Sequence, residues 1–145
     1  MDKKYLFGLL VLGFVLYGCG TSRKAVDKST DVPSSVTLTP DQQRKYDYFF
    51  LEAIRQKEKK EYTAAFGLLQ RALEINPNAA SALFEMAQYY MYLRQLPEAA
   101  QALEQAVKNA PDNYWYSQGL NALYQQQNET GKAIALLEQM TKRFP

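Results

Sequence analysis

Apolar positions in the second two-thirds of the chain recur with a helical period, and the same pattern returns every 34 residues. In each unit an alanine is followed four residues later by a leucine, and three residues after that by a small or flexible apolar side chain. The three triplets are Ala65, Leu69 and Ala72; Ala99, Leu103 and Ala106; and Ala133, Leu137 and Met140. Offsets of four and seven fall on one face of an α-helix. Each triplet therefore predicts a packing stripe whose alanine lets a second helix approach closely.

A second periodic segment precedes each stripe, and a proline follows it. In the middle unit Leu83, Met86, Ala87 and Tyr90 stand at offsets of zero, three, four and seven residues. The equivalent positions of the outer units are Phe49, Glu52, Ala53 and Gln56, and Ser117, Leu120, Asn121 and Tyr124. The closing prolines are Pro77, Pro111 and Pro145. Each unit thus predicts two helices and a break, because proline disfavours helical geometry in the residue before it.

The predicted helices cover residues of about 40–59, 63–75, 79–93, 97–108, 113–126 and 131–143. The start of the first carries a capping box, with Thr39 as N-cap, Pro40 at the first helical position and Gln42 three residues after the cap. Residues 128–130 match a glycosylation sequon, but we interpret them as a turn in which Thr130 caps the sixth helix. No segment alternates with the period of a strand, so the predicted fold class is all-α.

This pattern resembles the tetratricopeptide repeat, a unit of two helices over 34 residues that ends in proline. The resemblance covers residues 40–145, with repeats at about 46–79, 80–113 and 114–145. It implies a right-handed superhelical stack of three antiparallel helix pairs, whose first helices line a concave groove. Polar residues at Glu52, Gln56, Ser117 and Asn121 depart from the family pattern. We expect these departures to affect the packing of the outer units.

The first 18 residues form a different kind of segment. Lys3 and Lys4 precede an apolar run that ends in Leu16-Tyr17-Gly18-Cys19. The run is too short for a hydrocarbon core of about 30 Å, which favours a signal peptide. The sequence ending at Cys19 resembles the bacterial lipoprotein signal, which implies acylation of Cys19 as the mature N-terminus. An ordinary secretory signal with an incidental cysteine is the alternative.

The residue after the cysteine bears on localisation. Gly20 stands there instead of aspartate, which in a Gram-negative cell resembles the default signal for outer-membrane sorting. Residues 19–39 are rich in Ser and Thr and poor in large apolar side chains, so we expect a flexible linker. The expected location is the bacterial cell envelope, at the outer membrane and facing the periplasm.

Composition narrows the chemistry. The net charge is only +2, which argues against a nucleic-acid partner. The chain has no histidine, and lipidation would consume its only cysteine, so the commonest general base, soft metal ligands and a thiol nucleophile are missing. We therefore expect no enzyme activity, no catalytic residue, no metal and no cofactor.

The resemblance places the candidate binding site on the concave wall. The candidate partner-binding residues are Phe50, Ile54, Phe84, Gln88, Met91, Tyr92, Trp115, Gln118 and Gln125. Large amphipathic side chains dominate interface energetics, so a peptide or protein segment is the expected partner. Carbohydrate or peptidoglycan binding is the alternative, because Trp115 and Tyr92 offer stacking faces beside amides. A further alternative is that Tyr89, Tyr90 and these two aromatics mostly pack between neighbouring helix pairs.

The last predicted helix has no successor. Leu136, Met140 and Phe144 have no evident partner further along the chain, and repeat arrays usually end in a cap with a polar outer face. We expect either that the sequence is the front part of a longer repeat protein or that a second molecule covers this helix.

Overall fold

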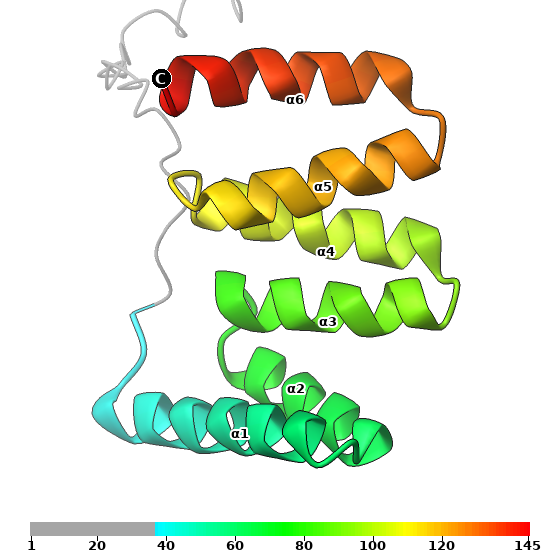
Figure 1. Cartoon of the computed structure of the whole chain (residues 1–145). Coiled ribbons are helices and arrows are strands. Elements are labelled where there is room, and N and C mark those ends of the chain that lie inside the picture. The colour runs from blue at the N-terminus through cyan, green and yellow to red at the C-terminus, as the bar shows by residue number, and fades with distance from the viewer. Residues whose placement is uncertain (1–36) are drawn as a thin grey trace, which may run out of the picture. The chain divides into compact units, whose positions relative to one another are not determined.

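The computed structural model describes residues 37–145, which contain helices and no strands. The helices are α1 (Pro40–Glu58), α2 (Tyr62–Ile75), α3 (Ala80–Tyr92), α4 (Leu96–Asn109), α5 (Tyr114–Gln126) and α6 (Thr130–Arg143). They form three antiparallel pairs stacked in chain order, from α1 at one end to α6 at the other (Figure 1). The all-α prediction is confirmed, and the six predicted segments agree with the observed helices to within one residue at each end. The predicted signal peptide, Cys19 and most of the linker lie outside the described residues.

The predicted capping box at the start of α1 is present. The Thr39 hydroxyl accepts a hydrogen bond from the Gln42 amide at 3.2 Å, and the Gln42 side-chain oxygen accepts one from the Thr39 amide at 2.9 Å. Two amide groups that a helix start leaves unpaired are thereby satisfied, and Pro40 has no amide hydrogen to satisfy. The prediction for Thr130 is wrong, because Glu129 occupies the N-cap and Thr130 is the first residue of α6.

The turn within each pair is built in the same way in all three repeats. Its left-handed residue is Lys60 (φ 66°), Arg94 (φ 61°) or Asn128 (φ 57°). The residue after it donates its amide to a carbonyl five residues earlier, for example Gln95 to Tyr90 at 2.8 Å. These bonds satisfy carbonyls at the helix end, and the chain reverses in two or three residues. The turn therefore fixes the second helix of each pair against the first.

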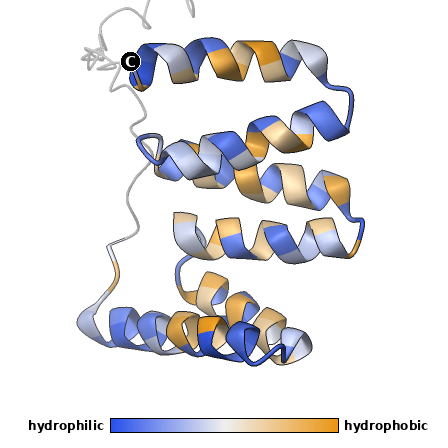
Figure 2. Cartoon of the chain, in the orientation of Figure 1, coloured by the Kyte–Doolittle hydropathy of each residue, from blue (hydrophilic) through white to orange (hydrophobic). Residues whose placement is uncertain are grey.

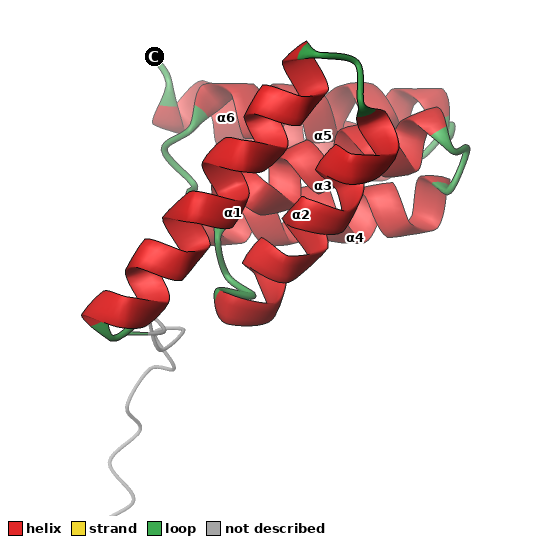
Figure 3. Cartoon of the chain, turned by 90° about the horizontal axis from the view of Figure 1, so that it is seen from below, coloured by secondary structure: helices red, strands yellow, loops and turns green. Residues whose placement is uncertain are grey.

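The stripes of the first two repeats form the core as predicted. Ala65, Leu69 and Ala72 on α2 are buried, and so are Ala99, Leu103 and Ala106 on α4. Figure 2 shows apolar and polar positions alternating along these helices, so one face packs while the other meets solvent. Seen along the stack, α1 and α2 lie in front of the other helices and at an angle to them (Figure 3).

The third stripe differs from the prediction. Leu137 is 41% exposed, while its neighbour Leu136 is buried in the core with Leu120. The prediction that Leu136, Met140 and Phe144 lack partners is also wrong: the first two are buried, and the Phe144 ring meets Tyr114 edge-on at 5.5 Å. The reason is that α6 packs only against the helices before it, so its core-facing stripe is shifted toward α5. Among residues 37–145, no helix is long and apolar enough to cross a membrane.

Candidate protein-binding groove

The helices α1, α3 and α5 run in the same direction and carry the predicted site residues (Figure 1). Phe50, Ile54, Phe84, Gln88 and Met91 are partly buried. Tyr92, Trp115, Gln118 and Gln125 are exposed, and the exposed fractions of the two aromatics are 80% and 67%. Tyr89 is buried and Tyr90 partly buried, and both rings meet Phe66 edge-on, so these two tyrosines pack between helix pairs.

Two polar contacts join α1 to α3. The hydroxyls of Tyr46 and Ser81 share a hydrogen bond at 3.1 Å, and the Lys57 ammonium lies 2.6 Å from the Glu85 carboxylate. Burial raises the pKa of Tyr46, and the hydrogen bond to Ser81 offsets part of that effect. These contacts fix the spacing of the first two repeats along the wall.

Two of the predicted site aromatics are engaged by neighbouring rings. Phe50 stacks on Tyr46 with ring centroids 5.8 Å apart, and Phe84 packs on Tyr116 of the next repeat at 4.9 Å. The second contact needs Gly119, since a Cβ there would lie 3.2 Å from the Phe84 ring. Burial, followed by the nearby Tyr46 and Glu85, raises the pKa of Tyr116. Sequence reasoning missed Tyr116, because its repeat position is the small, buried Ala82 in the middle unit.

A cavity of about 230 Å³ lies between α1, α2 and α3, and we call it the tyrosine pocket. It is lined by Lys57, Tyr62, Gln88, Tyr89 and Tyr92. Gln88 and Tyr92 were predicted site residues, and the structure brings them together. Tyr62 was missed because it is the first residue of a second helix, whereas the prediction considered only first helices. Its exposed fraction of 50%, large for an aromatic ring, is a property that only the structure provides.

The Tyr89 hydroxyl is buried in this pocket and has no hydrogen-bond partner among the described residues. The whole side chain is only 8% exposed. Burial first, then the neighbouring Glu85 and Tyr62, raises the pKa of Tyr89, so the group remains a neutral donor. A buried hydroxyl without a partner costs roughly 1–3 kcal/mol. The pocket thus contains a donor that a bound acceptor atom could satisfy.

Tyr92 and Trp115 lie at opposite ends of the wall. Trp115 is near the start of α5, at the repeat position that Ser81 occupies in α3, whereas Tyr92 ends α3. Eleven residues of helix separate Ser81 from Tyr92, or about 16 Å along the axis. Trp115 instead packs edge-on against Tyr114 at 5.6 Å. The two aromatics therefore belong to separate parts of the surface.

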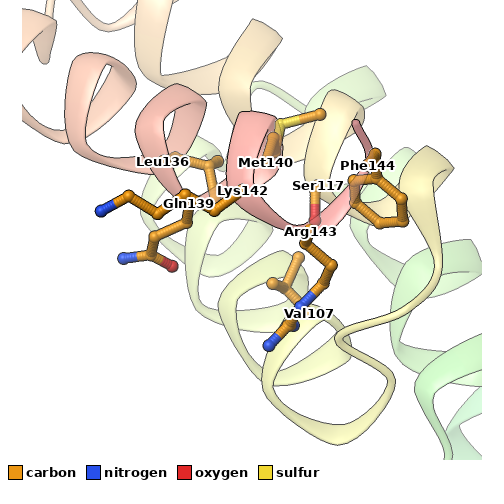
Figure 4. Close-up of a pocket in the computed structure, with 8 residues that line it drawn as sticks. All are labelled: Val107, Ser117, Leu136, Gln139, Met140, Lys142, Arg143 and Phe144. Carbon is orange, nitrogen blue, oxygen red and sulfur yellow. The ribbon is translucent and has the colours of Figure 1, made fainter.

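A second cavity, of about 430 Å³, lies between α4, α5 and α6 (Figure 4). Ser117 lines it, at the repeat position where the other units have Phe49 and Leu83. The short side chain leaves space between α5 and α6 that Val107, Met140 and Phe144 surround. None of the predicted site residues lines this cavity. Within residues 37–145, no three His, Cys, Asp or Glu side chains are grouped to hold a metal ion.

The pairs, the repeated turns and the groove define a helical-repeat solenoid. The model of the tetratricopeptide repeat family matches residues 57–119. This chain is a tetratricopeptide-repeat protein, and such proteins bind protein partners.

Solved structures show the same fold at low sequence identity. A crystal structure of MamA superposes with a TM-score of 0.61 and 18% identity over 68% of this chain and 57% of MamA. A second MamA structure gives a TM-score of 0.60 and 18% identity over 68% of this chain and 54% of that protein. The CopN-Scc3 complex gives 0.59 and 16% identity over 81% of this chain and 69% of the matched chain. The chain thus spans somewhat more than half the length of the MamA structures, and no curated protein sequence matches it.

Proposed function

We propose that this protein is a membrane-anchored interaction scaffold of the bacterial cell envelope, which binds an extended or helical segment of a partner protein along the wall of α1, α3 and α5. The tetratricopeptide fold supports the general role of a protein-protein interaction scaffold. The observation that carries the particular site is the tyrosine pocket, where exposed Tyr62 and Tyr92 flank the unsatisfied Tyr89 hydroxyl.

The pocket has the properties of an anchor site. Its volume of about 230 Å³ is comparable to that of a large side chain. Its lining is mostly aromatic carbon, with the Lys57 ammonium and the Gln88 amide at hand. Burying one large apolar side chain stabilises a complex by about 1.5–3 kcal/mol. A partner segment would insert an apolar side chain between Tyr62 and Tyr92 and offer an acceptor, such as a carbonyl oxygen, to Tyr89.

Acylation of Cys19 is the second part of the proposal. It rests on the residues Leu16-Tyr17-Gly18-Cys19. An anchor would hold the groove beside the membrane and raise the local concentration of membrane partners, so a weak groove would suffice. Cys19→Ser should abolish labelling by a fatty-acid analogue and leave the signal uncleaved by lipoprotein processing. A mature protein that begins elsewhere and carries no lipid would contradict this part.

No observation favours the carbohydrate alternative. It relied on Trp115 and Tyr92 acting together beside amides, and these two aromatics lie at opposite ends of the wall.

The groove can be tested with peptides selected by display on the full-length protein in a non-ionic detergent. Affinity of the selected peptides should fall about tenfold or more for Tyr92→Ala, because truncating an interface hot spot commonly costs about 2 kcal/mol. Tyr48→Ala is the matched control, since Tyr48 is 64% exposed but does not line the pocket. Its affinity should be unchanged, and both variants should keep the helical circular dichroism of the parent.

Two outcomes would count against the groove. Selection could fail to yield any specific peptide, or the selected peptides could bind Tyr92→Ala and Tyr48→Ala equally well. A selected peptide that depends on Trp115 but not on Tyr92 would move the site to the other end of the wall.

A further inference from the structure

The outward face of α6 carries an apolar strip that the equivalent helices bury. Ile134 is 52% and Leu137 is 41% exposed. One and two repeats earlier, the counterparts of Leu137 are Leu103 and Leu69, with exposed fractions of 0% and 1%. These leucines differ in their surroundings alone, because the first helix of a following repeat covers only the earlier two.

The cover on Leu103 shows what shape the strip on α6 accepts. Gly119 of α5 packs over it so closely that a Cβ on the glycine would lie 3.7 Å from the leucine side chain. α4 and α5 run antiparallel (Figure 1), and Leu103 and Leu120 belong to one buried cluster. The strip on α6 therefore fits the leading face of a first helix, the face that such a helix turns toward the preceding repeat.

The chain itself carries such a face uncovered. Leu51 of α1 stands at the repeat position of Glu85 and Gly119, and both of these contact the preceding repeat, through Lys57 and Leu103 respectively. Leu51 is 65% exposed. Tyr48, one turn earlier, is 64% exposed, although its counterpart Ala82 is fully buried.

We propose that α1 of a second copy of this chain docks on α6, head to tail, so that Leu51 of one molecule covers Leu137 of the next. The contact continues the α4–α5 packing from one molecule into another. Tyr48 would then lie toward Thr141, at the C-terminal end of α6. Arg55, on the other side of Leu51, would point toward Glu129 at the start of α6, which places opposite charges at that edge.

The polar part of the α1 face sets the strength of the contact. Glu52 and Arg55 form an ion pair where the middle repeat has buried Met86 and Tyr89. This pair stays at the edge of the contact and limits its apolar area, so the assembly should form at micromolar or higher concentration. Because the contact joins two different faces, each molecule keeps one free face at each end, and assembly continues until a ring closes or a filament grows.

Cysteine crosslinking tests the pairing directly. The full-length chain would carry Cys19→Ser, so that an introduced cysteine is its only thiol. Leu51→Cys and Leu137→Cys are made in separate molecules and oxidised alone and as an equimolar mixture. The mixture should give a disulfide-linked dimer at least five times more abundant than either variant alone. Leu51→Cys mixed with Gln101→Cys, an exposed position on α4, is the control and should give only background.

The outcomes separate the possible occupants of the strip. A dimer from Leu137→Cys alone, as abundant as that of the mixture, would mean that α6 pairs with itself and would overturn the proposal. A mixture that gives no more dimer than the Gln101→Cys control would overturn it as well. Sedimentation gives a second readout: Leu137→Lys should reduce the protein to a monomer without lowering its melting temperature, whereas a concentration-dependent mass that persists would contradict the contact. The proposal is independent of peptide binding in the groove, which Leu137→Lys should leave unchanged.

Discussion

The Lys57 ammonium and the Glu85 carboxylate lie 2.6 Å apart and connect the first helix of one repeat to that of the next. Glu85 is mostly buried, with 18% of its side chain exposed, while Lys57 is more open at 43%. A pair in this position links the register of two repeats at the edge of the tyrosine pocket.

A double-mutant cycle should measure this link. Lys57→Met and Glu85→Gln should each destabilise the protein, and their coupling energy should be about 0.5–1 kcal/mol, in the upper part of the range for exposed pairs. Urea unfolding of the four proteins gives the value. The Lys45–Asp41 pair, exposed on both sides at 2.7 Å, is the control and should couple more weakly. Equal coupling energies would mean that the Lys57–Glu85 pair does not stabilise the interface between repeats.

Tyr89→Phe should stabilise the free protein. Its hydroxyl is buried without a partner, so removing it should raise the free energy of unfolding by about 1 kcal/mol. Tyr124→Phe should do the opposite and cost about 1–2 kcal/mol, because the Tyr124 hydroxyl donates to the Glu104 carboxylate at 2.8 Å.

The same Tyr89→Phe variant should bind the display-selected peptides about tenfold more weakly, since it lacks the donor that the bound segment satisfies. Opposite changes in stability and affinity distinguish a binding role from a packing role. Loss of both, or of neither, would show that Tyr89 is an ordinary core residue.

Stability should fall in alkaline solution. Burial raises the pKa of Tyr46, Tyr89, Tyr116 and Tyr124 above 10.0 in the folded state, and the hydrogen bond to Glu104 adds to the effect on Tyr124. A tyrosine with a raised pKa contributes its full stability below pH 10, and that contribution is lost as the pH rises toward its folded pKa. The melting temperature should therefore drop between pH 10 and 11.5. Tyr124→Phe should flatten this drop, and a parent protein whose melting temperature is constant over the same range would contradict the prediction.

Filling the cavity beside Ser117 should stabilise the last repeat. Ser117→Leu restores the residue that the middle repeat has at Leu83, and the cavity of about 430 Å³ offers room for it. We expect a gain of about 1 kcal/mol in the free energy of unfolding and slower hydrogen exchange in α6. Ser81→Leu is the control, because Ser81 is bonded to Tyr46, and it should destabilise. A Ser117→Leu variant less stable than the parent would show that the cavity cannot accept the larger side chain.

The sequence by itself determined the helices and most of the core. Helix starts depend on residues within three or four positions of one another, as the Thr39–Gln42 box shows, and such local chemistry is legible along the chain. The same holds for the stripe at Ala99, Leu103 and Ala106, because a period of 3.6 residues places them on one face regardless of the partner.

Only the tertiary structure decided which face of α6 is covered and where the pocket lies. Leu137 has the same place in its repeat as Leu103, yet it is exposed, since burial requires a neighbouring helix and not merely a suitable residue. The tyrosine pocket combines Lys57, Tyr62 and Tyr89 from three helices, and no periodicity within one helix reports such a meeting. Local patterns specify helices and their apolar faces, whereas the arrangement of those faces in space specifies which side chains become a site.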